Sequence, residues 1–239
     1  MFEELDRFRH EHKYIEPEIN LTGMQMRLGH IMRLDGHVSE KGFYGVRSLY
    51  FDDYHSRYLN ENINGVDERM KWRIRIYDRN ASHISLERKV RKADLISKQS
   101  CTISVDDFYA VLDRSIRISP ENPPLFNLFV KELKTADLKP SIIVEYDRTP
   151  FVCAEGKTRV TIDRNIRSSL EAGAFLEDRE LMGRPVLMAG QGLIEVKYKA
   201  FLPDHIAHTI EHGRMRRDTF SKYYLACKFP YNGITAVHY

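Results

Sequence analysis

The stretch KWRIRIYD, Lys71–Asp78, decides the fold because its charged and apolar residues alternate. Successive side chains of a β-strand point to opposite faces. A strand built from this stretch therefore separates two sets of side chains, Arg73, Arg75 and Tyr77 on one face and Trp72, Ile74 and Ile76 on the other. Either the arginines face water at the surface of a sheet, or they converge on a polyanion in an enclosed space. The other strands of the chain bear on this choice.

Four further predicted strands carry a charged face opposite an apolar one. An exposed charged face is the default for an antiparallel sheet, but solvated faces are rarely this consistently basic with interspersed glutamate. If the sheet closes, these faces line a tunnel, and its glutamates either pair with the cations or hold a divalent metal. The residues that share a face are Arg9, Glu11 and Lys13; Glu87, Lys89 and Arg91; Arg159, Thr161 and Asp163; and Glu195, Lys197 and Lys199.

The pattern of the whole chain predicts an α+β fold of about eight strands with helices inserted between them. Short turns such as DRNA (78–81) indicate mostly antiparallel pairing, and eight strands close naturally into a small barrel. Ser104 begins the motif S-x-x-D, which predicts the N-terminal cap of a helix. The expected strands cover 8–16, 43–53, 69–78, 82–91, 97–104, 141–152, 158–167 and 192–202. No linker composition divides the chain, so one domain over residues 1–239 is expected.

Composition excludes several classes of protein. The 239 residues carry a formal net charge of only +3, so we do not expect a nucleic-acid binder, and any anion site must arise from local arrangement. No apolar run approaches the ~18 residues that span a membrane, and the N-terminal residues lack the apolar core of a signal peptide. We therefore expect a cytoplasmic protein without a membrane segment. No glycine-rich phosphate loop is present, so nucleotide binding would depend on side chains.

The cysteines and histidines show no metal-binding spacing along the chain. The three cysteines are odd in number and far apart, which makes a disulfide framework unexpected. Cys153 and Cys227 are interpreted as small buried hydrophobic residues. His205 and His208 are three residues apart on a predicted helix, where surface positions are expected.

A tunnel of arginine and lysine suits a linear polyphosphate, because guanidinium groups bind phosphate oxygens in pairs and ammonium groups add compact charge. An ordered set of motifs across Arg9–Tyr224 resembles the VTC domain, the polyphosphate polymerase domain of vacuolar transporter chaperone complexes and their bacterial relatives among the triphosphate tunnel metalloenzymes. The motifs are RHEHKY, VRSLYFDD, RIRIY, LERK, VEYDRTPF, RVTID, GLIEVKYK and FSKYY. The resemblance implies an eight-stranded antiparallel tunnel with helices packed outside, which would turn Arg73 and Arg75 inward.

The same resemblance implies roles for individual residues. Those assigned to the catalytic set are Lys13, Arg73, Arg75, Lys89 and Lys197. Those assigned to substrate phosphates are Arg9, Arg47, Arg148, Arg159 and Lys222. Glu195 resembles the glutamate that binds Mn²⁺ or Mg²⁺, whereas Glu11 and Glu87 are expected either to assist the metal or to pair with neighbouring cations.

The resemblance implies a metal-dependent polymerase that transfers the terminal phosphoryl group of ATP, or of another nucleoside triphosphate, to a growing polyphosphate chain. Two alternatives remain open at this point: a hydrolase of triphosphate or short polyphosphate, and a non-catalytic polyphosphate-binding module. Unlike the eukaryotic members of the family, this sequence shows neither a helical inositol-phosphate-sensing domain nor a transmembrane segment. We therefore do not extend the resemblance to translocation or to control by inositol pyrophosphates.

Overall fold

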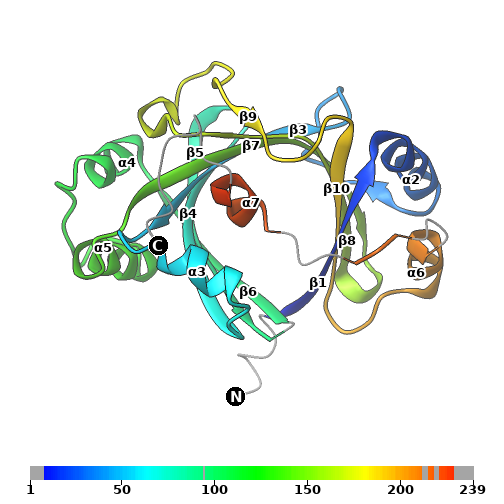
Figure 1. The fold of residues 1–239 in the computed structure, drawn as a ribbon, viewed down its shortest axis with the longest axis horizontal. Coiled ribbons are helices and arrows are strands. Elements are labelled where there is room, and N and C mark those ends of the chain that lie inside the picture. The colour runs from blue at the N-terminus through cyan, green and yellow to red at the C-terminus, as the bar shows by residue number, and fades with distance from the viewer. Residues whose placement is uncertain (1–7, 94, 212–214, 218–220, 229–239) are drawn as a thin grey trace.

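The central feature of the computed structural model is a closed antiparallel ring of eight strands (Figure 1). The structure describes residues 8–93, 95–211, 215–217 and 221–228. Around the ring the order is β7, β3, β4, β5, β6, β1, β10 and β8, and pairing of β7 with β8 closes it. The strands are β1 (Arg9–Pro17), β3 (Tyr44–Asp52), β4 (Glu68–Tyr77), β5 (Asn80–Lys92), β6 (Leu95–Ile103), β7 (Lys139–Cys153), β8 (Thr158–Ser169) and β10 (Gln191–Tyr198). The predicted number of strands and their antiparallel pairing are confirmed.

Two short strands extend the sheet beyond the ring. β2 (Arg33–Leu34) pairs with β7, and β9 (Arg184–Pro185) pairs with β8. Neither was predicted, because two residues are too few to show an alternating pattern. The strand expected at 192–202 ends at Tyr198, and the amide of Lys199 instead donates to the carbonyl oxygen of Gly156 at 2.9 Å.

The outward faces of the strands are apolar and are covered by helices on two sides (Figure 1). On one side, Trp72 of β4 is fully buried, its ring centroid lies 5.1 Å from that of Phe129, and its indole N–H donates to Glu132 at 2.9 Å. Both partners belong to α5 (Pro124–Thr135), which follows α4 (Val105–Leu112). The predicted cap of α4 is confirmed, since the Ser104 hydroxyl accepts from the Asp107 amide and the Asp107 carboxylate accepts from the Ser104 amide.

A second apolar cluster covers the opposite side of the ring. There α2 (Glu18–Ile31) and α6 (Asp204–Glu211) pack against the outward faces of β7, β8 and β10. Burial of these alternating apolar residues fixes which face of these strands turns outward, because a slip of one residue would turn the apolar set inward. The buried members include Leu21, Met24, Leu28, Phe151, Val160, Ile162, Ile194, Val196 and Ile206.

The last helix is the exception to the expectation that helices pack outside. α7 (Lys222–Lys228) lies inside the outline of the ring in Figure 1, and α3 (Arg57–Ile63) lies near it. The Tyr223 hydroxyl donates to Asp52 at 2.5 Å, and its ring centroid is 5.1 Å from that of Tyr50 on β3. These contacts place Ser221 and Lys222 against the interior of the ring. In the described residues no helix is long and apolar enough to cross a membrane.

Candidate functional site

Eight cationic side chains converge on one chamber inside the ring. The odd-numbered residues of β4 point inward, as the alternation in KWRIRIYD allows, and the other inward cations come from β1, β5, β7, β10 and α7. The chamber is lined by Lys13, Tyr50, Lys71, Arg73, Arg75, Lys89, Tyr146, Arg148, Glu195, Lys197, Ser221 and Lys222. Eight of the eleven residues predicted for the site therefore lie around one space, and the arginines of the opening stretch face inward.

Four buried carboxylates pair with these cations from the wall of the chamber. Glu11 contacts Lys13 at 2.8 Å, Lys89 at 2.9 Å and Lys197 at 3.5 Å. Glu195 contacts Lys197 at 2.6 Å, and Asp163 joins Arg148 at 2.7 Å to Lys222 at 2.6 Å. The fourth carboxylate, Glu87, pairs with Arg73. Among the described residues, eight cations against these four carboxylates leave an excess of positive charge facing the chamber. An anionic ligand would balance that excess.

The carboxylates are held in their ionised form. Burial would raise the pKa of Glu195, but Lys197, Lys222, Lys13 and Arg148 more than offset this and hold its pKa well below the ordinary value. Glu11 shows the same balance, with burial and Glu195 opposed by Lys13, Lys89 and Lys197, and its pKa is also well below the ordinary value. Both groups therefore remain available as anionic oxygen ligands at neutral pH.

Arg73 and Arg75 of β4 differ in how far neighbouring carboxylates neutralise their guanidinium groups. Arg73 donates to Glu87 at 2.7 Å and to the Tyr50 hydroxyl at 3.2 Å. Arg75 lies 4.0 Å from Glu87, and its guanidinium donates to the hydroxyls of Ser48 at 2.9 Å and Tyr146 at 3.3 Å. Neutral hydroxyls leave the charge of Arg75 less compensated than that of Arg73. We therefore regard Arg75 as the stronger phosphate-binding candidate of the two.

Two lysines of the chamber have lowered pKa values, chiefly because they are buried. Burial lowers the pKa of Lys89 to about 7, with Lys13 and Lys197 adding to this effect and Glu11 opposing it. Burial, together with Lys89, Lys13 and Arg73, lowers the pKa of Lys71 well below the ordinary value. A bound polyphosphate would supply the negative charge that favours protonation of both amines.

Lys71 lines the chamber although it was not among the residues predicted for the site. Lys71 lies on the same face of β4 as Arg73 and Arg75, because it is two residues before Arg73. The alternation that identified the arginines could therefore have identified Lys71 as well. Its ammonium group lies 3.2 Å from the Ser221 hydroxyl and near the rings of Tyr50 and Tyr223. Asp163 was placed on a charged strand face but was given no role, although it is fully buried and joins two cations of the chamber.

Arg47 was predicted to bind phosphate, and the structure places it outside the chamber instead. Its guanidinium is buried and donates to the carbonyl oxygens of Phe175, Glu177 and Arg179, at 3.0, 2.7 and 2.5 Å. It also pairs with Glu145 at 3.1 Å. The reason is parity, because Arg47 shares its face of β3 with apolar residues that pack outward, whereas its neighbour in sequence, Ser48, points inward.

We expect Arg47→Ala to lower the free energy of unfolding by about 3 kcal/mol, because the substitution removes a buried guanidinium that donates to three carbonyl groups and pairs with Glu145. Its affinity for tripolyphosphate should stay unchanged. Arg79→Ala is the matched control, since Arg79 also pairs with Glu145 at 2.9 Å but is more exposed, and it should cost less than about 1 kcal/mol. Chemical denaturation and titration calorimetry measure the two quantities. A loss of affinity without a loss of stability would return Arg47 to the ligand site.

The remaining two predicted residues lie at the edges of the chamber. Arg9, at the start of β1, lines a neighbouring cavity of about 400 Å³ together with Lys98 and the chamber residues Arg73, Lys89 and Lys197. Arg159 shares the inward parity of Asp163, but its guanidinium contacts Asp35 at 2.9 Å and the Tyr44 hydroxyl at 2.9 Å. It therefore lines a separate cavity rather than the central one.

The donor set of the chamber fits a hard divalent cation. Glu195 and Glu11 lie on neighbouring strands, both are ionised, and both contact Lys13 and Lys197. Mg²⁺ and similar ions are bound in proteins by one or two carboxylates together with substrate phosphates, which is the combination this chamber can offer. Glu195 and Glu11 are therefore the residues that would hold Mn²⁺ or Mg²⁺. Glu87 is less suited because, unlike Glu195 and Glu11, it lines neither the chamber nor the cavities that adjoin it.

Comparison with known proteins agrees with this architecture. The family model of the VTC domain matches residues 8–231. No curated protein matches the sequence. A solved structure of an adenylate cyclase candidate from Bacillus halodurans superimposes with a TM-score of 0.54 at 14% identity, covering 89% of this chain and 93% of that one.

Two further structures share the fold. An adenylyl cyclase candidate from Hippeastrum, whose structure is described as revealing a dominant triphosphatase activity, has a TM-score of 0.53 at 12% identity and covers 92% of this chain and 95% of its own. An adenylate cyclase candidate from Vibrio parahaemolyticus has a TM-score of 0.51 at 10% identity, with 92% and 97% covered. At these identities the likeness concerns the fold alone.

Proposed function

The chain belongs to the VTC domain family, and we propose that it is a metal-dependent polyphosphate polymerase that uses ATP or another nucleoside triphosphate. The supporting observation is that the cationic lining extends beyond the central chamber. The chamber shares Lys13, Lys71 and Lys89 with a second cavity, which continues to Arg69 and Arg91. It shares Arg73, Lys89 and Lys197 with the cavity that reaches Arg9 and Lys98.

This succession of cavities suits a linear polyanion longer than a triphosphate. Lys89 lines all three spaces and therefore lies where they meet. A triphosphate occupies only a short part of such a path, whereas a growing chain could leave the chamber along further cations. This extension favours a polymerase over an enzyme that only hydrolyses triphosphate.

The proposed reaction needs charge neutralisation and alignment more than covalent participation by the protein. A terminal oxygen of the polyphosphate attacks the γ-phosphorus of ATP, the bond from that phosphorus to the β,γ-bridging oxygen breaks, and ADP leaves with the bond electrons. Arg75, Arg73 and Arg148 would bind the phosphate oxygens and hold donor and acceptor in line. A divalent ion held by Glu195 and Glu11 would supply further neutralisation of the phosphate oxygens.

The decisive experiment follows phosphate transfer by the purified protein. The protein is incubated with ATP and Mn²⁺, and the products are separated by chain length on a gel and assayed for ADP. Polyphosphate that lengthens with time, at one ADP per phosphate added, supports the polymerase. Release of inorganic phosphate from ATP or tripolyphosphate without chain growth would show that the protein is a hydrolase and not a polymerase. If the protein binds polyphosphate tightly but turns over neither ATP nor tripolyphosphate, it is a non-catalytic polyphosphate-binding module.

Enclosure of the charge leads to an expectation about selectivity. Tripolyphosphate and polyphosphate should bind more tightly than duplex DNA, which cannot enter a chamber inside an eight-stranded ring. The net charge of +3 also offers little general attraction for nucleic acid. Competition between labelled polyphosphate and duplex DNA at moderate salt measures the order, and displacement by DNA would point to an external basic face.

We expect the affinity for tripolyphosphate to fall as the pH rises above about 7, the pKa of Lys89 without bound phosphate. Bound phosphate stabilises the protonated amine and raises its pKa, so binding takes up a proton between the two pKa values. In that window the association constant should fall by up to about tenfold per pH unit. Below it, Lys89 is protonated in both states and adds no pH dependence. Titration calorimetry at several pH values measures the effect.

Lys89→Arg is the control, because a guanidinium stays protonated throughout this range. Ionisation of tripolyphosphate itself affects both proteins equally, so the ratio of their association constants isolates the side chain. The ratio should change with pH above about 7 and stay constant below it. Parallel pH profiles for the two proteins would show that Lys89 is not the titrating group.

A further inference from the structure

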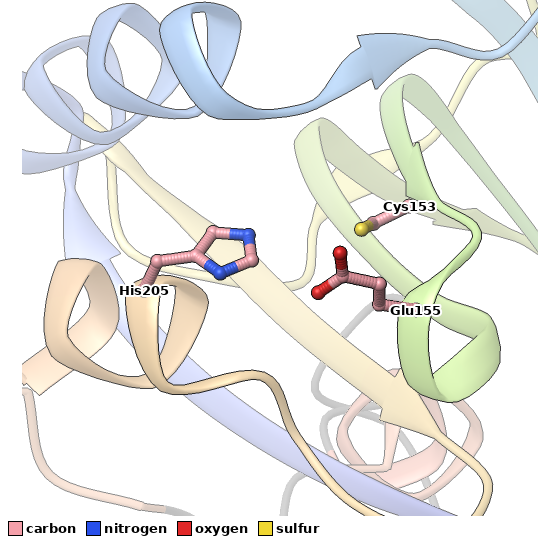
Figure 2. Close-up of side chains that lie close together, drawn as sticks. All are labelled: Cys153, Glu155 and His205. Atoms are coloured by element: carbon pink, nitrogen blue, oxygen red, sulfur yellow. The ribbon is translucent and has the colours of Figure 1, made fainter.

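A second cluster of metal-binding side chains lies on the outer face of the ring. Cys153 ends β7, Glu155 begins the short turn η1 (Glu155–Lys157), and His205 is in the first turn of α6. Figure 2 shows the three side chains turned toward one another across the gap between β7 and α6. One sulfur, one carboxylate oxygen and one ring nitrogen lie within 4.8 Å of one another.

This cluster is separated from the polyphosphate chamber by the wall of the ring. Cys153 has the outward parity of Phe151 and packs against the apolar cluster beneath α2 and α6, whereas Arg148 of the same strand points inward. None of the three residues lines the chamber or the cavities that adjoin it. A metal bound here would therefore be distinct from one held by Glu195.

The backbone around the cluster keeps its two halves close together. Gly156 has a φ of +60°, and a Cβ at this position would collide with the carbonyl oxygen of Phe201. The Lys199 amide donates to the Gly156 carbonyl at 2.9 Å. The turn that carries Glu155 is thus in contact with the segment that leads into α6, which fixes His205 opposite Cys153. Only glycine combines this close approach with a left-handed conformation.

We propose that Cys153, Glu155 and His205 form a zinc-binding site on the outside of the tunnel. Thiolate, imidazole and carboxylate are the ligand types of Zn²⁺, and this mixture of soft and harder donors distinguishes the cluster from an all-oxygen site for Mg²⁺ or Ca²⁺. Ligand atoms of a tetrahedral zinc are about 3.3–3.7 Å apart, as follows from metal–ligand distances of about 2.0–2.3 Å. A contraction of about 1 Å, within reach of side-chain rotation, would complete the set.

Bound zinc would join α6 to the turn between β7 and β8. Three protein ligands leave the fourth tetrahedral position for water or an external ligand, and Glu155 and His205 are both exposed. α6 packs on α2 and on the outward face of the ring. The ion would therefore hold this pair of helices against the turn between β7 and β8. The site would then stabilise the outer wall without entering the phosphate chemistry.

Cobalt is the probe for this site, because Co²⁺ substitutes for Zn²⁺ and a cobalt–thiolate bond absorbs in the near ultraviolet. The untagged full-length protein is reduced, freed of metal and titrated with Co²⁺. We expect one equivalent to produce the thiolate band and the visible bands of tetrahedral cobalt, and Zn²⁺ to displace it. Carboxylates of the chamber cannot produce the thiolate band, so the band reports a cysteine ligand, and the loss of the band in Cys153→Ser assigns it to the outer site.

Variants assign the ligands. The thiolate band should disappear in Cys153→Ser and persist in Cys101→Ser. Affinity for Co²⁺ should fall at least tenfold in His205→Ala and in Glu155→Gln, and stay unchanged in His208→Ala, one turn further along α6. Added Zn²⁺ should raise the midpoint of thermal unfolding of the parent protein, and not that of His205→Ala. Absence of the band in the parent protein, its persistence in Cys153→Ser, or equal affinities in His205→Ala and His208→Ala would each overturn the site.

Discussion

Glu195→Gln is expected to lower the metal-dependent turnover of ATP at least about hundredfold, the equivalent of about 2.7 kcal/mol in the activation barrier. Glutamine keeps the shape of the side chain but removes the charge that would bind the divalent ion. The substitution also removes one anion from a chamber whose cations outnumber its carboxylates. Metal-free binding of tripolyphosphate should therefore stay the same or become tighter. Steady-state assays over a range of Mn²⁺ concentrations, with calorimetry in chelator, measure both effects.

The matched control is Glu68→Gln, which removes an exposed carboxylate at the start of β4, 3.3 Å from Lys92. Its turnover and metal dependence should equal those of the parent protein. Normal turnover of Glu195→Gln at limiting Mn²⁺ would show that Glu195 serves only as a partner of Lys197. In that case Glu11 would be the next carboxylate to replace, because it shares both Lys13 and Lys197 with Glu195.

Arg75→Ala is expected to weaken the binding of tripolyphosphate by about ten- to a hundred-and-fifty-fold. The expectation corresponds to the ~1.5–3 kcal/mol of a charge-assisted hydrogen bond. The cost in stability should be smaller, because the partners that Arg75 leaves are the hydroxyls of Ser48 and Tyr146. Arg73→Ala should also weaken binding, but it removes the closest partner of the buried Glu87 and should destabilise the fold more. Calorimetry and chemical denaturation separate binding from folding.

Arg88→Ala is the control on the opposite face of the same wall. Arg88 follows Glu87 on β5, points outward, and lies 5.7 Å from the ring centroid of Trp72. Its removal should leave the affinity for tripolyphosphate unchanged. Unchanged affinity in Arg75→Ala and Arg73→Ala as well would mean that the chamber is not where the phosphates bind.

Which side chains of a strand share a face could be predicted, because successive side chains point to opposite faces. That the charged face turns inward was implied by the family resemblance, since alternation alone also allowed an exposed charged face. Once Trp72, Ile74 and Ile76 are assigned to the core, the arginines between them must face the other way. The same rule would have rejected Arg47, whose face of β3 also carries the buried Leu49 and Phe51, and would have admitted Lys71.

The sequence by itself determined the number of long strands, their antiparallel pairing and which residues of a strand share a face, because these properties depend on local alternation and short turns. Only the tertiary structure decided which inward residues meet. Arg159 has the correct parity, yet Asp35 from a distant loop binds it at the edge, whereas Lys222 reaches Asp163 from α7. Cys153 and His205 likewise become neighbours only when α6 packs on the ring. Such contacts join segments far apart in the chain, and their geometry depends on ring closure and helix packing rather than on spacing in the sequence.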